Sequence, residues 1–112
     1  MKVPVIKPVG STNMWVVVER WSEKHTDVII DISPGFCTDL ASVPKWARSI
    51  IQKTDRRFWG PAIAHDYRYI YEIGDKRISD LNFYLGLRKN EVHIVKAIIA
   101  YIAVIYGGKG AW

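Results

Sequence analysis

The sequence predicts an α+β domain: a small N-terminal antiparallel sheet, made of a hairpin and an edge strand, packed with three to four C-terminal helices. The first third of the chain holds short segments rich in β-branched and aromatic residues, which favour strands. The remainder holds longer segments with helical periodicity and helix-capping residues. No repeat or linker divides the 112 residues, so we expect one domain over residues 1–112 with one hydrophobic core.

The strands are expected near the N-terminus. Residues 3–6 are apolar and precede a Pro- and Gly-containing link, which predicts the edge strand. Residues 14–21 and 27–32 are both typical of strands, and the polar link 22–26 between them predicts the hairpin. His25 lies in this link and is interpreted as an exposed loop residue without a function.

A helix over residues 61–73 is predicted to be the element around which the rest is arranged. Pro61 suits the first helical turn, and Gly74 suits the left-handed residue that closes a helix. At 100° per residue, one face comprises Ala62, Ile63, Asp66, Tyr69, Ile70 and Ile73, and the opposite face comprises Ala64, Arg68 and Glu72. A carboxylate within an apolar face requires hydrogen-bond donors, a cation or a metal. Asp66, with its neighbour His65, therefore indicates a site.

Three further helices are predicted. Pro44 helps to start one that contains Trp46, Ile50 and Ile51, and Asp75 caps another over residues 76–89. The last runs from Asn90 and Glu91 to Gly107-Gly108, and its nearly all-round apolar character predicts the central core helix. Trp112 is expected to dock back onto the domain. In the helix 76–89, Asp80 shares a face with Phe83, Tyr84 and Leu87, so it is expected to point inward.

Composition narrows the setting. Apolar residues make up 49% and charged residues 24% of the chain, which is ordinary for a folded, soluble domain. Cys37 has no intramolecular disulfide partner, no signal peptide is recognised, and the apolar run 97–106 is too short for a membrane span. These features predict a cytoplasmic protein. The net charge of +5 includes a basic cluster that could meet nucleic acid, although a solvated surface is favoured: Lys45, Arg48, Lys53, Arg56 and Arg57.

Three motifs resemble a family of small phage and prophage proteins of unassigned function. They are G-F-x-T-D-L-A-S-V-P at residues 35–44, P-A-x-x-H-D-x-x-Y at residues 61–69, and R-x-x-D at residues 77–80. The resemblance covers about residues 28–112 and includes the apolar last helix. It implies a location in the host cytoplasm or the virion, and it implies no established reaction. Position 37 is variable in the family pattern, which argues against a role for Cys37.

Asp39, His65, Asp66 and Asp80 form the predicted site. One imidazole with several carboxylates suits Mn²⁺, Mg²⁺, Fe²⁺ or catalytic Zn²⁺, and such an ion could support hydrolysis by activating water and polarising a phosphoryl or carbonyl group. His65, Asp66 and Asp39 are the candidate catalytic residues, and all four are candidate ligands. Four supporting residues surround them in the motifs: Thr38, Ser42, Tyr69 and Arg77. The His-Asp dipeptide is similar to the centre of HD-type phosphohydrolases, but the rest of their histidine-rich signature is missing.

Two other interpretations stay open. The same residues could form a satisfied buried polar network, with donors such as Arg77, Tyr69 or tryptophan, that fixes two helices on the sheet. The protein would then be a virion or tail component, or a phage-encoded binder of a host protein. A thiol mechanism using Cys37 and His65 is the least favoured, because Cys37 does not lie at a helix N-terminus or beside a cation.

Overall fold

The computed structural model describes residues 1–40 and 54–107, and it confirms the predicted α+β class. The strands are β1 (Ile6–Pro8), β2 (Trp15–Val17), β3 (Trp21–Lys24), β4 (Ile29–Ile32) and β5 (Cys37–Thr38). A 3-10 turn, η2 (Arg56–Phe58), leads into the helices α1 (Trp59–Tyr71), α2 (Lys76–Lys89) and α3 (Ile94–Gly107). The helix predicted to start at Pro44 and the predicted docking of Trp112 lie outside the described residues.

The strands form two small antiparallel sheets. β2 pairs with β1 on one side and β5 on the other, whereas β3 pairs with β4. The predicted continuous strand 14–21 is therefore wrong, because the chain leaves one sheet after Val17 and enters the other at Trp21. The polar link 22–26 is also wrong in part, since residues 22–24 belong to β3. Residues 17 and 21 have the same strand parity, so alternation could not reveal the bend between them.

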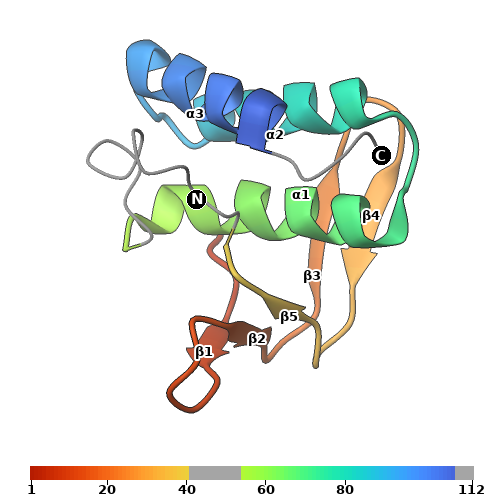
Figure 1. Ribbon diagram of the computed structural model, residues 1–112, viewed down its shortest axis with the longest axis vertical. Helices are drawn as coiled ribbons and strands as arrows, with labels where there is room; N and C mark the ends of the chain where they lie inside the picture. The colour runs from red at the N-terminus through yellow and green to blue at the C-terminus, as the bar shows by residue number, and fades with distance from the viewer. Residues whose placement is uncertain (41–53, 108–112) are drawn as a thin grey trace.

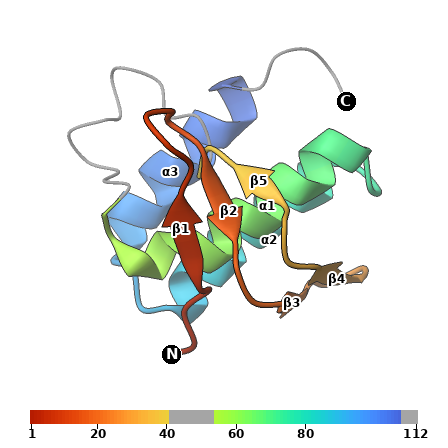
Figure 2. The ribbon, with the colours of Figure 1, turned by 90° about the horizontal axis from the view of Figure 1, so that it is seen from below.

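Helix α1 is the central element of the fold. In Figure 1 it lies between the layer of α2 and α3 and the strands, and Figure 2 shows β1, β2 and β5 crossing it on the side away from those helices. One buried cluster fills the helical side: Phe58, Ala62, Phe83, Leu87, Val92, Ala97, Ala100 and Ala103. The other fills the side of the strands: Val17, Ile30, Ile32, Leu40, Ile63 and Ala64. Both sides of α1 are therefore covered.

This position of α1 corrects the predicted helix faces. The periodicity places Ala64 and Arg68 on the exposed face, but both side chains are fully buried, because strands and the hairpin cover that face as well. Ile70 was placed on the buried face, and it is 53% exposed. A single amphipathic stripe is thus the wrong description for a helix that packs on two layers.

Helix α3 is the outer helix, so its predicted place at the centre of the core is wrong. It packs against α2 through small side chains, Ala97, Ala100 and Ala103, which are buried. Its isoleucines instead lie partly exposed on the other side. Small residues let two helices approach closely, and this packing determines which side of α3 faces inward. No helix within the described ranges is both long and apolar enough to cross a membrane.

Local signals explain the ends of the helices. The Asp75 carboxylate accepts a hydrogen bond from Arg77 N at 2.8 Å and caps α2, as predicted. Pro61 lies in the first turn of α1, also as predicted. The prediction that Gly74 closes α1 is wrong, because the left-handed residue that ends the helix is Glu72, with φ 50°; Gly74, with φ 74°, lies in the connection that follows. The short α1–α2 connection places the C-terminal half of α1 beside the start of α2.

Candidate functional site

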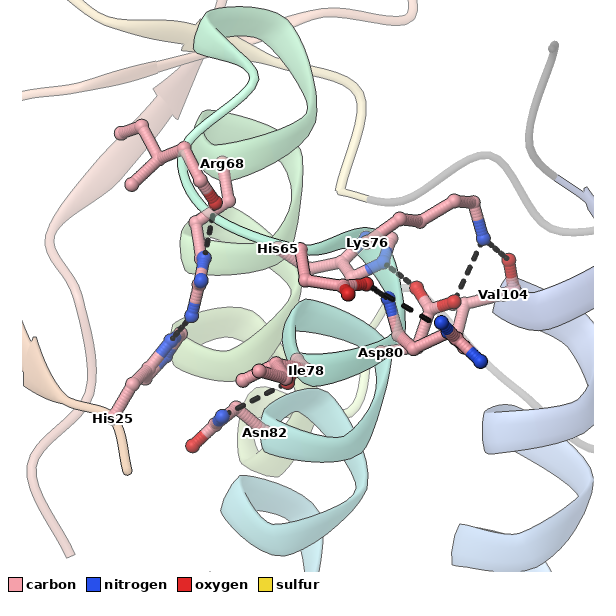
Figure 3. A network of polar contacts seen from close by, with 11 residues as sticks. His25, His65, Arg68, Lys76, Ile78, Asp80, Asn82 and Val104 are labelled. Carbon is pink, nitrogen blue, oxygen red and sulfur yellow. Dashed lines mark hydrogen bonds and ion pairs between the residues drawn. The ribbon is translucent and has the colours of Figure 1, made fainter. Parts of the chain in front are cut away.

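His65 on α1 and Asp80 on α2 form the centre of a buried ionic network. His65 Nε2 lies 2.6 Å from Asp80 Oδ1, and Lys76 Nζ donates to Asp80 Oδ2 at 2.7 Å and to Val104 O at 3.4 Å. Figure 3 shows these side chains meeting between the three helices. Asp80 is only 2% exposed, which agrees with the expected inward orientation. A carboxylate oxygen accepts hydrogen bonds, so His65 Nε2 is the donor in its contact with Asp80.

Asp66 and Asp39 form a second acidic group beside this network. Asp66 is mostly buried and receives a hydrogen bond from the Thr38 side chain. The pKa of the Asp66 carboxyl is raised from its ordinary 3.8 to about 6, mainly by burial and also by the neighbouring Asp39, although Thr38 and His65 oppose the rise. Among the described residues, no lysine or arginine forms an ion pair with either aspartate.

The loop that carries Asp39 is held in an unusual backbone conformation. Thr38 is fully buried, and its hydroxyl oxygen accepts a hydrogen bond from Leu40 N at 3.0 Å. Leu40 itself is buried and has φ 60°, in the left-handed region that residues with side chains rarely adopt. Asp39 is therefore fixed between a buried hydroxyl and a strained residue. Ser42, predicted to support the site, lies outside the described residues.

The remaining predicted site residues have different surroundings. Arg77 was expected to donate into the network, but its side chain is 93% exposed and its nearest ionic partner is Asp75 at 3.9 Å. Lys76, one residue earlier, occupies the role expected of Arg77, since a one-residue step rotates a helical side chain by about 100°. Tyr69 is half-buried on α1. Cys37 is exposed, and its thiol lies 3.8 Å from Gly35 O.

The basic cluster is only partly described. Lys45, Arg48 and Lys53 lie outside the described residues. Arg57 pairs with Asp55 at 2.7 Å, and Arg56 stacks over the Trp59 ring at 5.8 Å. The two described members therefore have partners within the protein.

A third polar group, which the sequence did not indicate, connects α1 with the β3–β4 hairpin. Arg68 is fully buried, and its guanidinium donates to both Asp27 carboxylate oxygens at 2.9 and 2.6 Å and to Ile73 O at 3.1 Å. It also lies 3.1 Å from His25 Nδ1, as Figure 3 shows. Burial, and then the Arg68 charge, lower the pKa of His25 to about 4. The expectation that His25 is exposed is therefore wrong, because the residue is half-buried against Arg68.

Glu23 on β3 is a further buried acid. Its side chain packs near Gly60 and Gly86 and lines a cavity of about 720 Å³ between the hairpin and α2. Burial raises the pKa of Glu23 from 4.5 to about 7, while the Trp21 indole and Lys89 act in the opposite direction. The indole N–H lies near the carboxyl without full hydrogen-bond geometry, and Glu23 Oε2 has no hydrogen-bond partner in the described part of the chain. The alternation of β3 could have suggested this burial, because Trp21 and Glu23 share one side of the strand.

The fold and the site together define the class of protein. It is an α+β domain in which Asp80 forms buried ion pairs, whereas Asp66 lies beside a second acid, Asp39. The chain belongs to the family described as "Protein of unknown function (DUF1353)", whose model matches residues 15–104. That range contains every described residue of the candidate site. No curated protein and no solved structure matches the chain.

Proposed function

We propose that this protein is a hydrolase whose reaction takes place at Asp39, His65 and Asp66. The main support is the contrast between two buried carboxyls. Asp80 is paired with Lys76 and His65, as expected of a group that stabilises packing. Asp66 is buried beside Asp39, and no described cation pairs with it. Such a group lowers stability and is kept mostly where function needs it.

The backbone near Asp39 supports the same location. Strained φ values persist where the surrounding structure enforces them, and they collect at functional sites. Leu40 has such a value, is buried, and directly follows Asp39. One of the residues at positive φ therefore adjoins Asp39, which forms no ion pair within residues 1–40 and 54–107.

The two aspartates fit a divalent cation of the magnesium type. Mg²⁺ commonly uses one or two carboxylates, with waters and substrate phosphate oxygens completing its coordination, and Mn²⁺ accepts similar ligands. Asp39 and Asp66 would hold the ion, and when bound it would polarise a phosphoryl or carbonyl oxygen of the substrate. Asp80 is better suited to positioning than to ligation, because both of its oxygens have partners. Within residues 1–40 and 54–107, no group of three or more histidine, cysteine or acidic side chains is arranged for a metal.

His65 would act as the base. Its Nε2 proton is directed to Asp80, so the lone pair of Nδ1 can accept a proton from an attacking water. Lys76 holds the Asp80 carboxylate in place, and Asp80 in turn orients the imidazole. Asp66, with a pKa of about 6, is mostly a carboxylate at neutral pH and is available as a ligand.

The test combines activity with stability. Purified full-length protein is assayed against chromogenic phosphomonoesters, phosphodiesters and carboxylic esters with millimolar Mg²⁺ or Mn²⁺, and with chelator. Melting curves are recorded under the same conditions, because a ligand that binds only the native state raises its apparent stability. Asp66→Asn and Asp39→Asn should fold but lose both the hydrolysis and the cation-dependent stabilisation. Asp31→Asn is the matched control, because Asp31 lies at an exposed position of β4.

Two results would refute the proposal. One is a wild-type protein that hydrolyses nothing in the panel and whose melting ignores both chelator and millimolar cation. The other is an Asp66→Asn variant that keeps full activity. Either would favour the alternative in which these residues only stabilise a virion component or a binder of host proteins. The phage or prophage setting remains part of this proposal and is supported by the motif resemblance.

A further inference from the structure

The cavity beside the β3–β4 hairpin has an unpaired hydrogen-bond donor and an unpaired acceptor in its wall. Its volume of about 720 Å³ lies within the range of about 300 to 1,000 Å³ that small-molecule sites occupy. β3 and the hairpin turn line one side, and the second half of α2 lines the other. The Trp21 Nε1 and Glu23 Oε2 atoms are both buried, and neither has a hydrogen-bond partner among the described residues. The cavity therefore has polar groups ready for a ligand.

Two helix glycines allow β3 and the helices to pack closely at this cavity. A Cβ on Gly60 of α1 would lie 2.8 Å from Trp21 Cζ2, and a Cβ on Gly86 of α2 would lie 2.9 Å from Pro61 Cγ. The same two Cβ positions lie 3.5 and 3.9 Å from Glu23 Oε1. Glycine destabilises a helix relative to alanine, so this close approach explains both glycines. The Trp21 and Glu23 side chains are thus held against the helices.

The carboxyl of Glu23 has no structural use that the described residues reveal. No lysine or arginine within residues 1–40 and 54–107 forms an ion pair with it. Burial raises the pKa of Glu23 to about 7, so the folded protein is less stable when this group is charged. A glutamine of the same shape would avoid that cost. Perturbed acids in cavities are typical of binding and catalytic sites, which indicates that the carboxyl serves a ligand.

Lysines at the cavity provide charge for an anionic part of that ligand. Lys2, Lys24 and Lys89 line the cavity, all three are exposed, and none forms an ion pair within the described ranges. Of the acids in these ranges, Glu91 lines the cavity together with Glu23, so the lysines outnumber the acids. Lysine ammonium groups bind phosphate as point charges. A phosphorylated ligand therefore suits the cavity better than a cation does.

We propose that this cavity binds a guanine nucleotide. The N1–H and 2-amino groups of guanine would donate to the Glu23 carboxylate, and the guanine O6 would accept from the Trp21 indole N–H, which lies near that carboxylate. The phosphate would meet the three lysines. The inference is independent of the proposed hydrolase activity, because Asp39, His65 and Asp66 do not line the cavity.

The order of donors and acceptors separates guanine from the other purines. Hypoxanthine keeps the N1–H and O6 but lacks the second donor to Glu23. Adenine presents a ring nitrogen without hydrogen beside its amino group, and it has no oxygen for the Trp21 N–H to meet. A buried polar group that loses its partner is costly, and sites built on hydrogen bonds reject analogues that lack them. Affinity should therefore fall from guanosine to inosine to adenosine 5′-monophosphate.

Isothermal titration calorimetry of the full chain with these nucleotides, without divalent cation, is the test. Glu23→Gln removes the buried charge and should fold, and it should bind guanosine 5′-monophosphate about tenfold or more weakly. Glu19→Gln is the matched control, because Glu19 is exposed and outside the cavity, and it should bind as wild type does. Lys89→Gln should weaken binding of the monophosphate and leave that of guanosine unchanged, whereas Lys7→Gln, on exposed β1, should change neither.

The proton–nitrogen NMR signal of the Trp21 indole gives a second readout. This signal, assigned by its loss in Trp21→Phe, should shift when guanosine 5′-monophosphate is added. If Glu23→Gln fails to fold, the indole signal of wild type decides, because binding that leaves it unmoved would overturn the proposal.

Four further results would overturn the proposal. They are no binding at millimolar guanosine 5′-monophosphate, equal affinity of wild type and Glu23→Gln, adenosine 5′-monophosphate bound as tightly as the guanine nucleotide, and guanosine bound as tightly as its monophosphate. The first two would remove the ligand from Glu23, the third would remove guanine, and the fourth would remove the phosphate.

Discussion

Removal of the Asp27 carboxylate is predicted to be among the most damaging single changes on the surface of this protein. Asp27 is exposed as a residue and lies in a hairpin turn, so the sequence gives it no special place. It is nevertheless the carboxylate that pairs with Arg68, and the Arg68 side chain is 0% exposed. Asp27→Ala therefore leaves a buried guanidinium with Ile73 O and His25 as its remaining polar neighbours.

The magnitude follows from the burial of the arginine. Breaking a buried ion pair by removing one partner costs about 3 to 5 kcal/mol, because the remaining charge is left without compensation. The Asp27 side chain is 29% exposed, so water can partly replace it, and the lower value of about 3 kcal/mol is expected. At roughly 4 °C per kcal/mol for a domain of this size, the melting temperature should fall by about 12 °C.

Urea and thermal unfolding of Asp27→Ala and Asp31→Ala measure this effect. Asp31 pairs with Arg20 at the surface, where both side chains are largely exposed, so Asp31→Ala should unfold close to wild type. The Arg68 hydrogen bonds lower the pKa of Asp27, so the folded state favours its carboxylate. The stabilisation by Asp27 is fully present above the pKa that Asp27 has in the unfolded state, and it is lost as pH falls through its lower pKa in the folded state. The difference in unfolding free energy between wild type and Asp27→Ala should therefore shrink in acid.

The reasoning would be refuted if Asp27→Ala and Asp31→Ala unfolded at the same urea concentration. A second comparison isolates the unpaired charge. The double variant Asp27→Leu/Arg68→Met removes both charges and should be more stable than Asp27→Ala, because apolar groups can replace a buried pair. If the double variant were instead the less stable of the two, the loss would come from packing and not from the buried charge.

Three further predictions concern buried acids and one glycine. Near pH 8, Asp66→Asn should melt at the same temperature as wild type or higher. Wild type loses stability as pH rises from about 4 through the folded-state pKa of Asp66, which is about 6, so a lower melting temperature for Asp66→Asn would contradict burial of the charge. The free energy of unfolding of wild type should fall by about 3 kcal/mol as pH rises from 4.5 to 7, because the folded state favours protonated Glu23, and urea titrations of Glu23→Gln should not show this fall. Equal pH profiles for the two proteins would contradict the prediction. Gly74→Ala should cost more than about 1 kcal/mol, since a Cβ there would lie 2.5 Å from Arg68 Nη2, whereas Gly10→Ala, also at positive φ but in open space, should cost less in the same denaturation assay.

The sequence determined the features that depend on neighbours along the chain. The Asp75 cap and the extent of α2 were predicted correctly, because a capping carboxylate and its N–H partner lie two residues apart. Pro61 located the start of α1 in the same way. The inward orientation of Asp80 followed from its apolar companions at helical spacing. The motifs also brought attention to Asp39, His65 and Asp66, which lie near one another in the folded chain.

Only the tertiary structure decided which group pairs with which. Arg68 and Asp27 are 41 residues apart, and His65 meets Asp80 across two helices, so no local pattern contains either contact. Periodicity gives one buried face per helix, yet α1 is covered on both sides and buries Arg68, whereas α3, the most apolar helix, remains at the surface. Burial depends on what packs against a face, and side chains far away in the sequence supply that covering.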